Sequence, residues 1–260
     1  MTESRTIAII QGRMSSSRLP GKILLDIAGK PMLQHMVERT RLAKTVDQVV
    51  VATSTDPSDD PVEEFCREFG VPFYRGSQAD VLDRFYQAAH LFQAGTVVRL
   101  TADCPLLDPV LVDETVSLFR SSGADFTANR LPPPFHRTYP IGLDTEVCSF
   151  AALERAWKEA TALHDREHVL PYLYEVEGRF RVAVLNYHQD YGSLRWTVDT
   201  PADLELVRQV YIRLGERADF NWLDVLAVFE KEPELAQINA GVQHKSMFDV
   251  DVRSINRKES

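Results

Sequence analysis

The stretch IAIIQGRMSSSRLPGK, residues 7–22, passes from an apolar segment of strand length directly into a loop of serines and cations. Gly12 allows close backbone approach, the serines offer hydroxyl and N–H groups, and Arg13, Arg18 and Lys22 carry positive charge. These groups can together hold a polyphosphate. Composition alone fits a solvated surface turn equally well, but the place directly after a buried strand favours a binding loop.

Outward from this loop, apolar runs of strand length alternate with amphipathic stretches of helix length. This order predicts an α/β fold of three layers, α/β/α, with a mainly parallel mixed sheet. Ligands of such sheets bind beyond the carboxyl ends of the strands, where the opening loop and TADCPLLDP at 101–109 both lie. The expected strands are 6–10, 48–54, 71–76 and 96–103, and the expected helices are 31–44, 59–70, 79–92 and 109–123.

The alternation breaks at NRLPPPFHRTYPIG, residues 129–142, whose prolines fit neither a helix interior nor a central strand. We interpret it as an arm that opens a small inserted lobe, 129–192. The lobe is expected to hold strands at 143–150 and 179–186 and helices at 151–162 and 166–177. A strand at 194–198, a turn and then a long helix with Pro201 near its first turn, ending at 214, are expected to rejoin the main sheet. The predicted nucleotide-binding domain is therefore 1–128 with 193–235, followed by a polar tail, 236–260.

The composition of the chain limits the classes of function that it can have. The chain has 260 residues, 44% of them hydrophobic, and a net charge of −9, which argues against a nucleic-acid partner. Its three cysteines are far apart, so no disulfide framework or zinc site can be deduced from their spacing. No signal peptide and no apolar run long enough for a membrane span is found. A cytoplasmic protein without a membrane partner is expected.

The opening loop resembles the signature loop of bacterial CMP-sugar synthetases, the cytidylyltransferases that activate Kdo and sialic-acid-like sugars. The Kdo branch has approximately P-A-R-x-x-S-x-R-L-P-G-K, and this chain matches it from Arg13 to Lys22, with Gln11 and Gly12 in place of Pro-Ala. A second family motif, G-K-P-M-I-x-H, is similar to residues 29–35. The resemblance is strongest to the spore coat polysaccharide biosynthesis protein F group and extends to VLDRF, RLTADCPLLDP, REHV and WTVDTPADLELV.

The resemblance implies a Rossmann-like nucleotide-diphospho-sugar transferase fold, Mg²⁺ as cofactor and a homodimer. It places the metal carboxylates at Asp103, at the end of the expected strand at 96–103, and at Asp199, after the expected strand at 194–198. Mg²⁺ prefers such hard oxygen ligands and usually takes one or two carboxylates. An aspartate just before a helix is more often a cap, so each residue alone fits a structural role as well. The two together, in the family's motifs, favour the metal.

Three further groups of residues receive roles. Arg13 and Lys22 are expected to be catalytic, since they would neutralise charge on the triphosphate. Thr101 stands where the Kdo branch has a glutamine, so the base is less well specified, and Cys104 is interpreted as a small buried filler. Asp83 and Arg84 match a family segment but fit an exposed helix face equally well. The expected nucleotide-binding residues are Gln11, Gly12, Ser15, Ser16, Arg18, Asp83, Arg84 and Thr101.

The expected sugar-binding residues lie in the inserted lobe. Arg166, Glu167 and His168 cluster at an expected helix start, where an arginine could pair with a sugar carboxylate. Asp144 and Glu146 alternate on an expected strand and therefore point to one face. A solvated helix start and a surface strand face are the structural alternatives for these two groups.

The function expected from the resemblance is transfer of CMP from CTP to a Kdo- or sialic-acid-like sugar acid, with release of pyrophosphate, for surface polysaccharide biosynthesis. A glycosyltransferase of the GT-A type is one alternative, but its Asp-x-Asp spacing occurs only at Asp249 and Asp251, in the tail. Another NTP-sugar nucleotidyltransferase is a second alternative. A non-catalytic nucleotide-binding module would have little reason to combine the cations of the loop with both aspartates.

Overall fold

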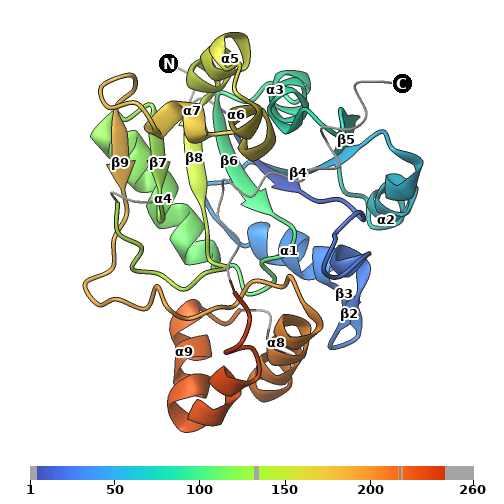
Figure 1. Cartoon of the computed structure of the whole chain (residues 1–260). Coiled ribbons are helices and arrows are strands. Elements are labelled where there is room, and N and C mark those ends of the chain that lie inside the picture. The colour runs from blue at the N-terminus through green and yellow to red at the C-terminus, as the bar shows by residue number, and fades with distance from the viewer. Residues whose placement is uncertain (1–4, 132–134, 216, 218, 244–260) are drawn as a thin grey trace.

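A computed structural model describes residues 5–131, 135–215, 217 and 219–243. Its centre is a seven-stranded mixed sheet with the order β5-β4-β1-β6-β8-β7-β9 (Figure 1). Neighbours run parallel from β5 to β6, and β8 is antiparallel to both β6 and β7. The strands are β1 (Thr6–Gln11), β4 (Gln48–Ser54), β5 (Phe73–Gly76), β6 (Thr96–Thr101), β7 (Phe126–Ala128), β8 (Glu146–Ser149) and β9 (Val182–Val184), and β2 (Asp26–Ile27) and β3 (Lys30–Pro31) form a separate pair.

Helices cover both faces of this sheet (Figure 1). In β1, Ile7 and Ile9 pack into a core that includes α3 and α5, whereas Ala8 and Ile10 pack into a second core with α1, α2 and α4. Successive side chains of a strand point to opposite faces, so a fully apolar strand must be covered twice. The helices are α1 (Met32–Thr40), α2 (Asp60–Glu68), α3 (Val81–Leu91), α4 (Pro109–Ser122) and α5 (Phe150–Glu159). The predicted three-layer α/β/α fold is confirmed.

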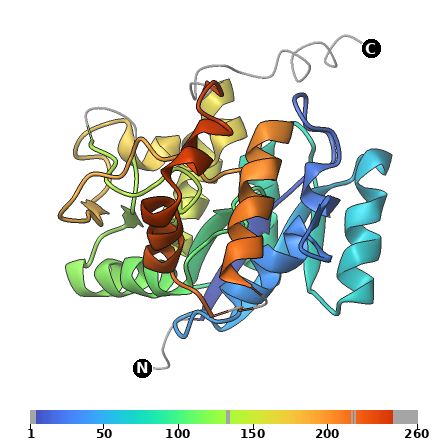
Figure 2. The same cartoon turned by 90° about the horizontal axis from the view of Figure 1, so that it is seen from below.

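The helices α8 (Pro201–Leu214) and α9 (Trp222–Lys231) form a third apolar cluster, which faces the viewer in Figure 2. The strand expected at 194–198 does not form. Instead, Trp196 N donates to Ile141 O at 2.7 Å and Val198 N donates to Asp103 O at 2.8 Å, so this segment bonds to two loops rather than to the sheet. The segment thus carries Asp199 to the carboxyl end of β6.

The expected lobe, 129–192, contributes β8 and β9 to the main sheet, and its boundaries stay a prediction. The helix expected at 166–177 is two short helices, α6 (Leu163–His168) and α7 (Pro171–Tyr174). Val169 separates them with a φ of 77°, and Pro171 cannot donate a backbone hydrogen bond. Arg166, Glu167 and His168 therefore lie at the end of a helix, not at its start. Residues 132–134 of the expected arm and 244–260 of the tail lie outside the described residues.

Among the described helices, none is both long and apolar enough to cross a bilayer.

Gly142 lies where the loop after β7 meets the segment before α8. Its φ is 109°, and an added Cβ would lie 2.5 Å from Thr197 N. Gly178 also has a positive φ, 76°, but open space around it. We expect Gly142→Ala to lower the free energy of unfolding clearly more than Gly178→Ala, because only the first adds a backbone clash to the strain of about 1–3 kcal/mol that both share. Urea unfolding followed by circular dichroism measures both, and equal losses would contradict the close approach.

Candidate active site

The loop after β1 packs directly against the loop after β6. Gly12 N donates to Ala52 O of β4 at 3.2 Å, and a Cβ at Gly12 would lie 2.9 Å from the Cβ of Ala102 in the loop after β6. The glycine is therefore required by packing between the two loops. This close contact brings the start of the cationic loop beside the segment that contains Asp103.

Internal hydrogen bonds give the cationic loop its shape. Gly21 N donates to Met14 O at 2.9 Å, and Leu19 N donates to Ser16 Oγ at 3.3 Å. Met14 N donates at 2.7 Å to Oδ1 of Asp59, a fully buried residue whose other oxygen accepts from the backbone N of Ser54. The sequence analysis missed Asp59, which lies in the 3₁₀ helix η2 (Pro57–Asp59), because an aspartate 45 positions away gives no local sign of this contact.

Lys22 begins the 3₁₀ helix η1 (Lys22–Leu24) and is only 8% exposed. Its Nζ donates to Asp103 Oδ2 at 2.7 Å, to Asp199 Oδ1 at 2.8 Å and to Val198 O at 2.8 Å. Burial by itself would lower the pKa of Lys22, but Asp103 and Asp199 raise it above its ordinary value. The two predicted metal carboxylates thus converge on one cation, which is the amino group of the predicted catalytic lysine.

Asp199 also binds two arginines. Its Oδ2 accepts from Arg18 Nη2 at 2.8 Å and from Arg195 Nη2 at 2.7 Å. Burial would raise the pKa of Asp199, but Lys22, Arg195 and Arg18 hold it well below its usual range. Arg195 is itself held by the buried Asp203 through a 2.9 Å bond from Nε. The carboxylate is therefore ionised and held in a fixed orientation.

The structure decides against the capping alternative for both aspartates. The N-cap of α8 is Thr200, which forms a capping box with Asp203, and the N-cap of α4 is Asp108. Asp103 and Asp199 make neither of these caps. Their carboxylates point to the site where Lys22 lies.

A cavity of about 320 Å³ opens between the cationic loop, the end of β6 and α6. Small-molecule pockets are commonly about 300–1,000 Å³. The cavity brings together most of the predicted nucleotide residues and both predicted metal ligands, together with Glu167 and His168. The predicted residues that line it are Gln11, Gly12, Arg13, Ser15, Ser16, Arg18, Lys22, Thr101, Asp103, Glu167, His168 and Asp199.

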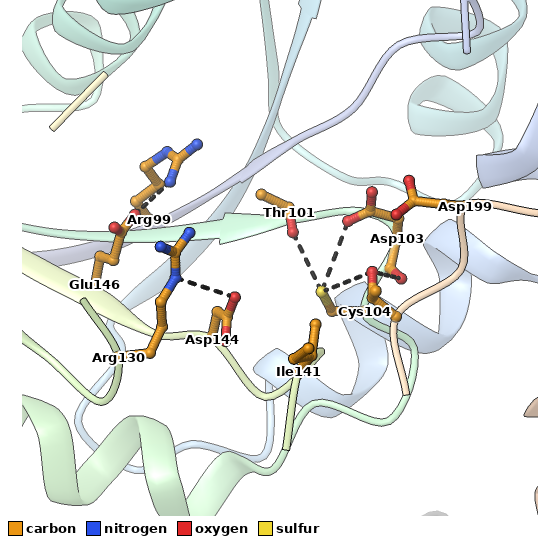
Figure 3. A pocket seen from close by; sticks show the side chains of 10 residues that line it. Arg99, Thr101, Asp103, Cys104, Arg130, Ile141, Asp144, Glu146 and Asp199 are labelled. Atoms are coloured by element: carbon orange, nitrogen blue, oxygen red, sulfur yellow. Dashed lines mark hydrogen bonds and ion pairs between the residues drawn. The ribbon is translucent and has the colours of Figure 1, made fainter. Parts of the chain in front are cut away.

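A second cavity, of about 160 Å³, adjoins the first and is drawn in Figure 3. It contains the predicted Asp144 and Glu146, each with an arginine partner: Arg130 Nε donates to Asp144 at 3.3 Å, and Arg99 pairs with Glu146. The sequence analysis missed both arginines. Arg99 could have been recognised as a site residue because it is the one charged residue in the strand TVVRLT. No local sequence feature distinguished Arg130. Arg99, Thr101, Asp103 and Asp199 line both cavities.

Cys104 lies in the wall of this second cavity and is only 4% exposed. Burial and the nearby Asp103 raise the pKa of its thiol well above the ordinary value. The sulfur therefore stays protonated at neutral pH and is a poor nucleophile. This agrees with its interpretation as a buried filler.

Three predicted site residues line neither cavity. Asp83 accepts from Trp157 Nε1 at 2.9 Å, which ties α3 to α5. Arg84 is fully buried, its Nη1 donates to Ser77 O at 2.7 Å, and burial with the charge of Arg13 lowers its pKa to about 10. Arg166 donates from Nε to both oxygens of Asp80 at 3.0 Å and from Nη1 to Trp157 O at 2.7 Å. Asp83 and Arg166 thus connect α3 and its N-cap Asp80 to α5 and α6 behind the site, whereas Arg84 is bonded to the segment just before its own helix.

Two adjoining cavities, one of them lined by a cationic loop, meet at paired carboxylates beyond the carboxyl ends of parallel strands. This arrangement is that of the α/β proteins whose ligands bind in the crevice beyond the carboxyl ends of the strands. The cytidylyltransferase family model matches residues 7–245 of the chain. The chain therefore belongs to the cytidylyltransferase family.

Curated relatives agree with this membership. An uncharacterised protein of Methanocaldococcus jannaschii is 35% identical over 95% of this chain and 99% of its own length. The spore coat polysaccharide biosynthesis protein SpsF of Bacillus subtilis is 32% identical over 88% of this chain and 95% of its own. The 3-deoxy-manno-octulosonate cytidylyltransferase of Geobacter sulfurreducens is 41% identical, but over only 42% of this chain and 43% of its own.

Solved structures show the same fold. A cytidylyltransferase from Leptospira borgpetersenii superposes with a TM-score of 0.85 at 33% identity, covering 93% of this chain and all of that one. A CMP-2-keto-3-deoxy-manno-octonic acid synthetase in complex with CTP superposes with a TM-score of 0.62 at 23% identity, covering 82% of this chain and all of that one. The second likeness concerns the fold alone.

Proposed function

We propose that this protein transfers CMP from CTP to a Kdo- or sialic-acid-like sugar acid, giving a CMP-sugar and pyrophosphate for surface polysaccharide biosynthesis. One observation carries the proposal: two cavities of different character share the carboxylates of Asp103 and Asp199. A transferase that joins two substrates needs two neighbouring subsites with the reacting atoms at their boundary.

The larger cavity suits the triphosphate. Arg13, Arg18 and Lys22 face it from one loop, and their charges would neutralise the negative charge that grows on the departing pyrophosphate. In the reaction, the anomeric oxygen of the sugar bonds to the α-phosphorus, the bond from that phosphorus to the pyrophosphate oxygen breaks, and the anomeric hydroxyl loses its proton to water. The nucleophile belongs to the substrate, which fits the protonated state of Cys104.

The smaller cavity suits the sugar acid. Arg99 and Arg130 can pair with its carboxylate, and Asp144 and Glu146 can accept hydrogen bonds from its hydroxyl groups. The names of the relatives support an acceptor of this class, because the Geobacter enzyme is named for 3-deoxy-manno-octulosonate. SpsF is named for spore coat polysaccharide biosynthesis, which supports a product used in a surface glycan.

We further propose Mg²⁺ as the cofactor, held by Asp103 and Asp199. The residues fit it: two carboxylate oxygens already converge on one positive charge, that of Lys22. Oxygen ligands of this kind are those that Mg²⁺ prefers. When bound, the ion would neutralise phosphate oxygens and polarise the α-phosphate. Lys22, which lines the same cavity, would supply positive charge to the triphosphate beside the ion.

The direct test is release of pyrophosphate. We expect the purified protein with Mg²⁺, CTP and a sugar acid such as Kdo or N-acetylneuraminate to release pyrophosphate and form the CMP-sugar, with CTP preferred over ATP, GTP and UTP. A coupled pyrophosphate assay and mass spectrometry of the product measure this. Release of free nucleotide from a nucleotide-sugar would favour the glycosyltransferase alternative, and binding without turnover would favour a non-catalytic module.

A substitution at Arg130 tests whether the sugar acid binds in the smaller cavity. Arg130→Gln is expected to raise KM for the sugar acid about tenfold or more, because a charged hydrogen bond is lost, and to leave KM for CTP nearly unchanged. Asp144 keeps a 2.5 Å bond from Arg137, so the fold should persist. The matched control is Arg166→Gln, which is expected to lower the melting temperature without separating the two KM values. If Arg166→Gln instead raised KM for the sugar acid alone, Arg166 would be a sugar-binding residue.

A substitution at Lys22 tests whether Asp103 and Asp199 hold the metal, with paramagnetic Mn²⁺ as the probe. In Lys22→Gln, we expect Mn²⁺ alone to bind more tightly than in the wild type, because the ammonium no longer competes for Asp103 and Asp199. Turnover should fall about 10²–10³-fold, because a cation at the triphosphate is lost. Lys30→Gln removes an exposed ion pair with Glu38 outside both cavities and should change neither quantity. Electron paramagnetic resonance measures free Mn²⁺. An unchanged Mn²⁺ affinity in Lys22→Gln would contradict the proposal that the ion and the Lys22 ammonium compete for Asp103 and Asp199.

A further inference from the structure

A second cluster of candidate metal ligands lies outside both cavities, where α6 meets the end of α7. It consists of His164 and Asp165 in α6 and Glu175 directly after α7. His164 Nε2 lies 2.9 Å from Glu175 Oε2 and 3.6 Å from Asp165 Oδ1, and all three ligand atoms lie within 4.8 Å of one another. Ligands about 2.0–2.1 Å from a tetrahedral ion are about 3.4 Å apart, so a small adjustment would let all three reach one ion.

The environment of Asp165 is a second, independent indication. Asp165 is only 6% exposed, and within the described residues its Oδ1 has no hydrogen-bond donor. The two arginines nearby are engaged elsewhere: Arg166 binds Asp80, and Arg179 Nη1 donates to Tyr172 O at 3.1 Å. A buried carboxylate oxygen without a donor is costly, and a bound cation would satisfy it.

The ligand set indicates the kind of ion. One imidazole nitrogen with two carboxylate oxygens suits Zn²⁺ or a similar first-row transition ion, whereas Mg²⁺ prefers oxygen ligands alone. We infer that His164, Asp165 and Glu175 form a binding site for Zn²⁺, with water as the fourth ligand. The ion joins α6 to α7. Because Glu167 and His168 of α6 line the larger cavity, the ion also holds that wall in place.

The test uses the full chain, stripped with EDTA and titrated with Zn²⁺ by calorimetry in millimolar Mg²⁺, which occupies sites built from oxygen alone. We expect one Zn²⁺ per chain and a higher melting temperature once it is bound. His164→Gln and Glu175→Gln should each weaken binding at least about tenfold, the lower end of what disturbing a metal site costs. Both side chains are partly exposed, so these variants should fold, and circular dichroism verifies this.

The matched control is His136→Gln. His136 Nε2 also contacts a carboxylate, Asp190 Oδ2 at 2.8 Å, but this exposed pair has no third ligand in the clusters found among the described residues. Its replacement should leave Zn²⁺ binding unchanged. Absence of stoichiometric binding would overturn the inference. So would binding that survives in both His164→Gln and Glu175→Gln, because the ion would then lie elsewhere, and neither outcome depends on transferase activity.

Discussion

The ammonium group of Lys22 lies between the carboxylates of Asp103 and Asp199, and it joins three segments that are far apart in sequence: the loop after β1, the end of β6 and the turn before α8. Charges buried to this extent are stable only when they are paired and hydrogen-bonded. Loss of Lys22 would remove the cation that Asp103 and Asp199 share, although Asp199 would keep Arg18 and Arg195. The positions of the loop, the sheet edge and α8 are therefore coupled by one charge cluster.

Further buried groups form hydrogen bonds with this charge cluster and support it. Arg195 connects Asp199 to Asp203, and Asn239 Nδ2 donates to Asp203 Oδ1 at 2.9 Å. The Asp199 carboxylate thus has its orientation fixed from behind, which is what a site needs to meet a ligand without reorganising. The same bonds join α8, through Asp203, to the segment before it and to Asn239 after η3 (Pro233–Gln237). Stability and the shape of the site depend on the same groups here, so substitutions in this cluster are expected to affect both.

Much of this was accessible from local sequence. The apolar runs at 48–54 and 96–103 predicted central strands because a strand covered on both faces must be apolar throughout. The cations after β1 and the aspartate after β6 could be assigned to one site because the carboxyl ends of parallel strands share an edge. The failed prediction of a strand at 194–198 has an equally physical reason. An apolar segment can be buried against loops as well as in a sheet, and its composition does not distinguish the two.

The sequence by itself determined the α/β fold, the cationic loop and the family, because these depend on periodicity and on residues close together in the chain. Only the tertiary structure decided which charged side chains face the cavities. Arg166, an expected sugar ligand, binds Asp80, 86 positions away, and lines neither cavity, whereas Arg130 meets Asp144, 14 positions away. The role of a charged side chain depends on the partner that it contacts, and partners far away in sequence are brought to it by tertiary packing.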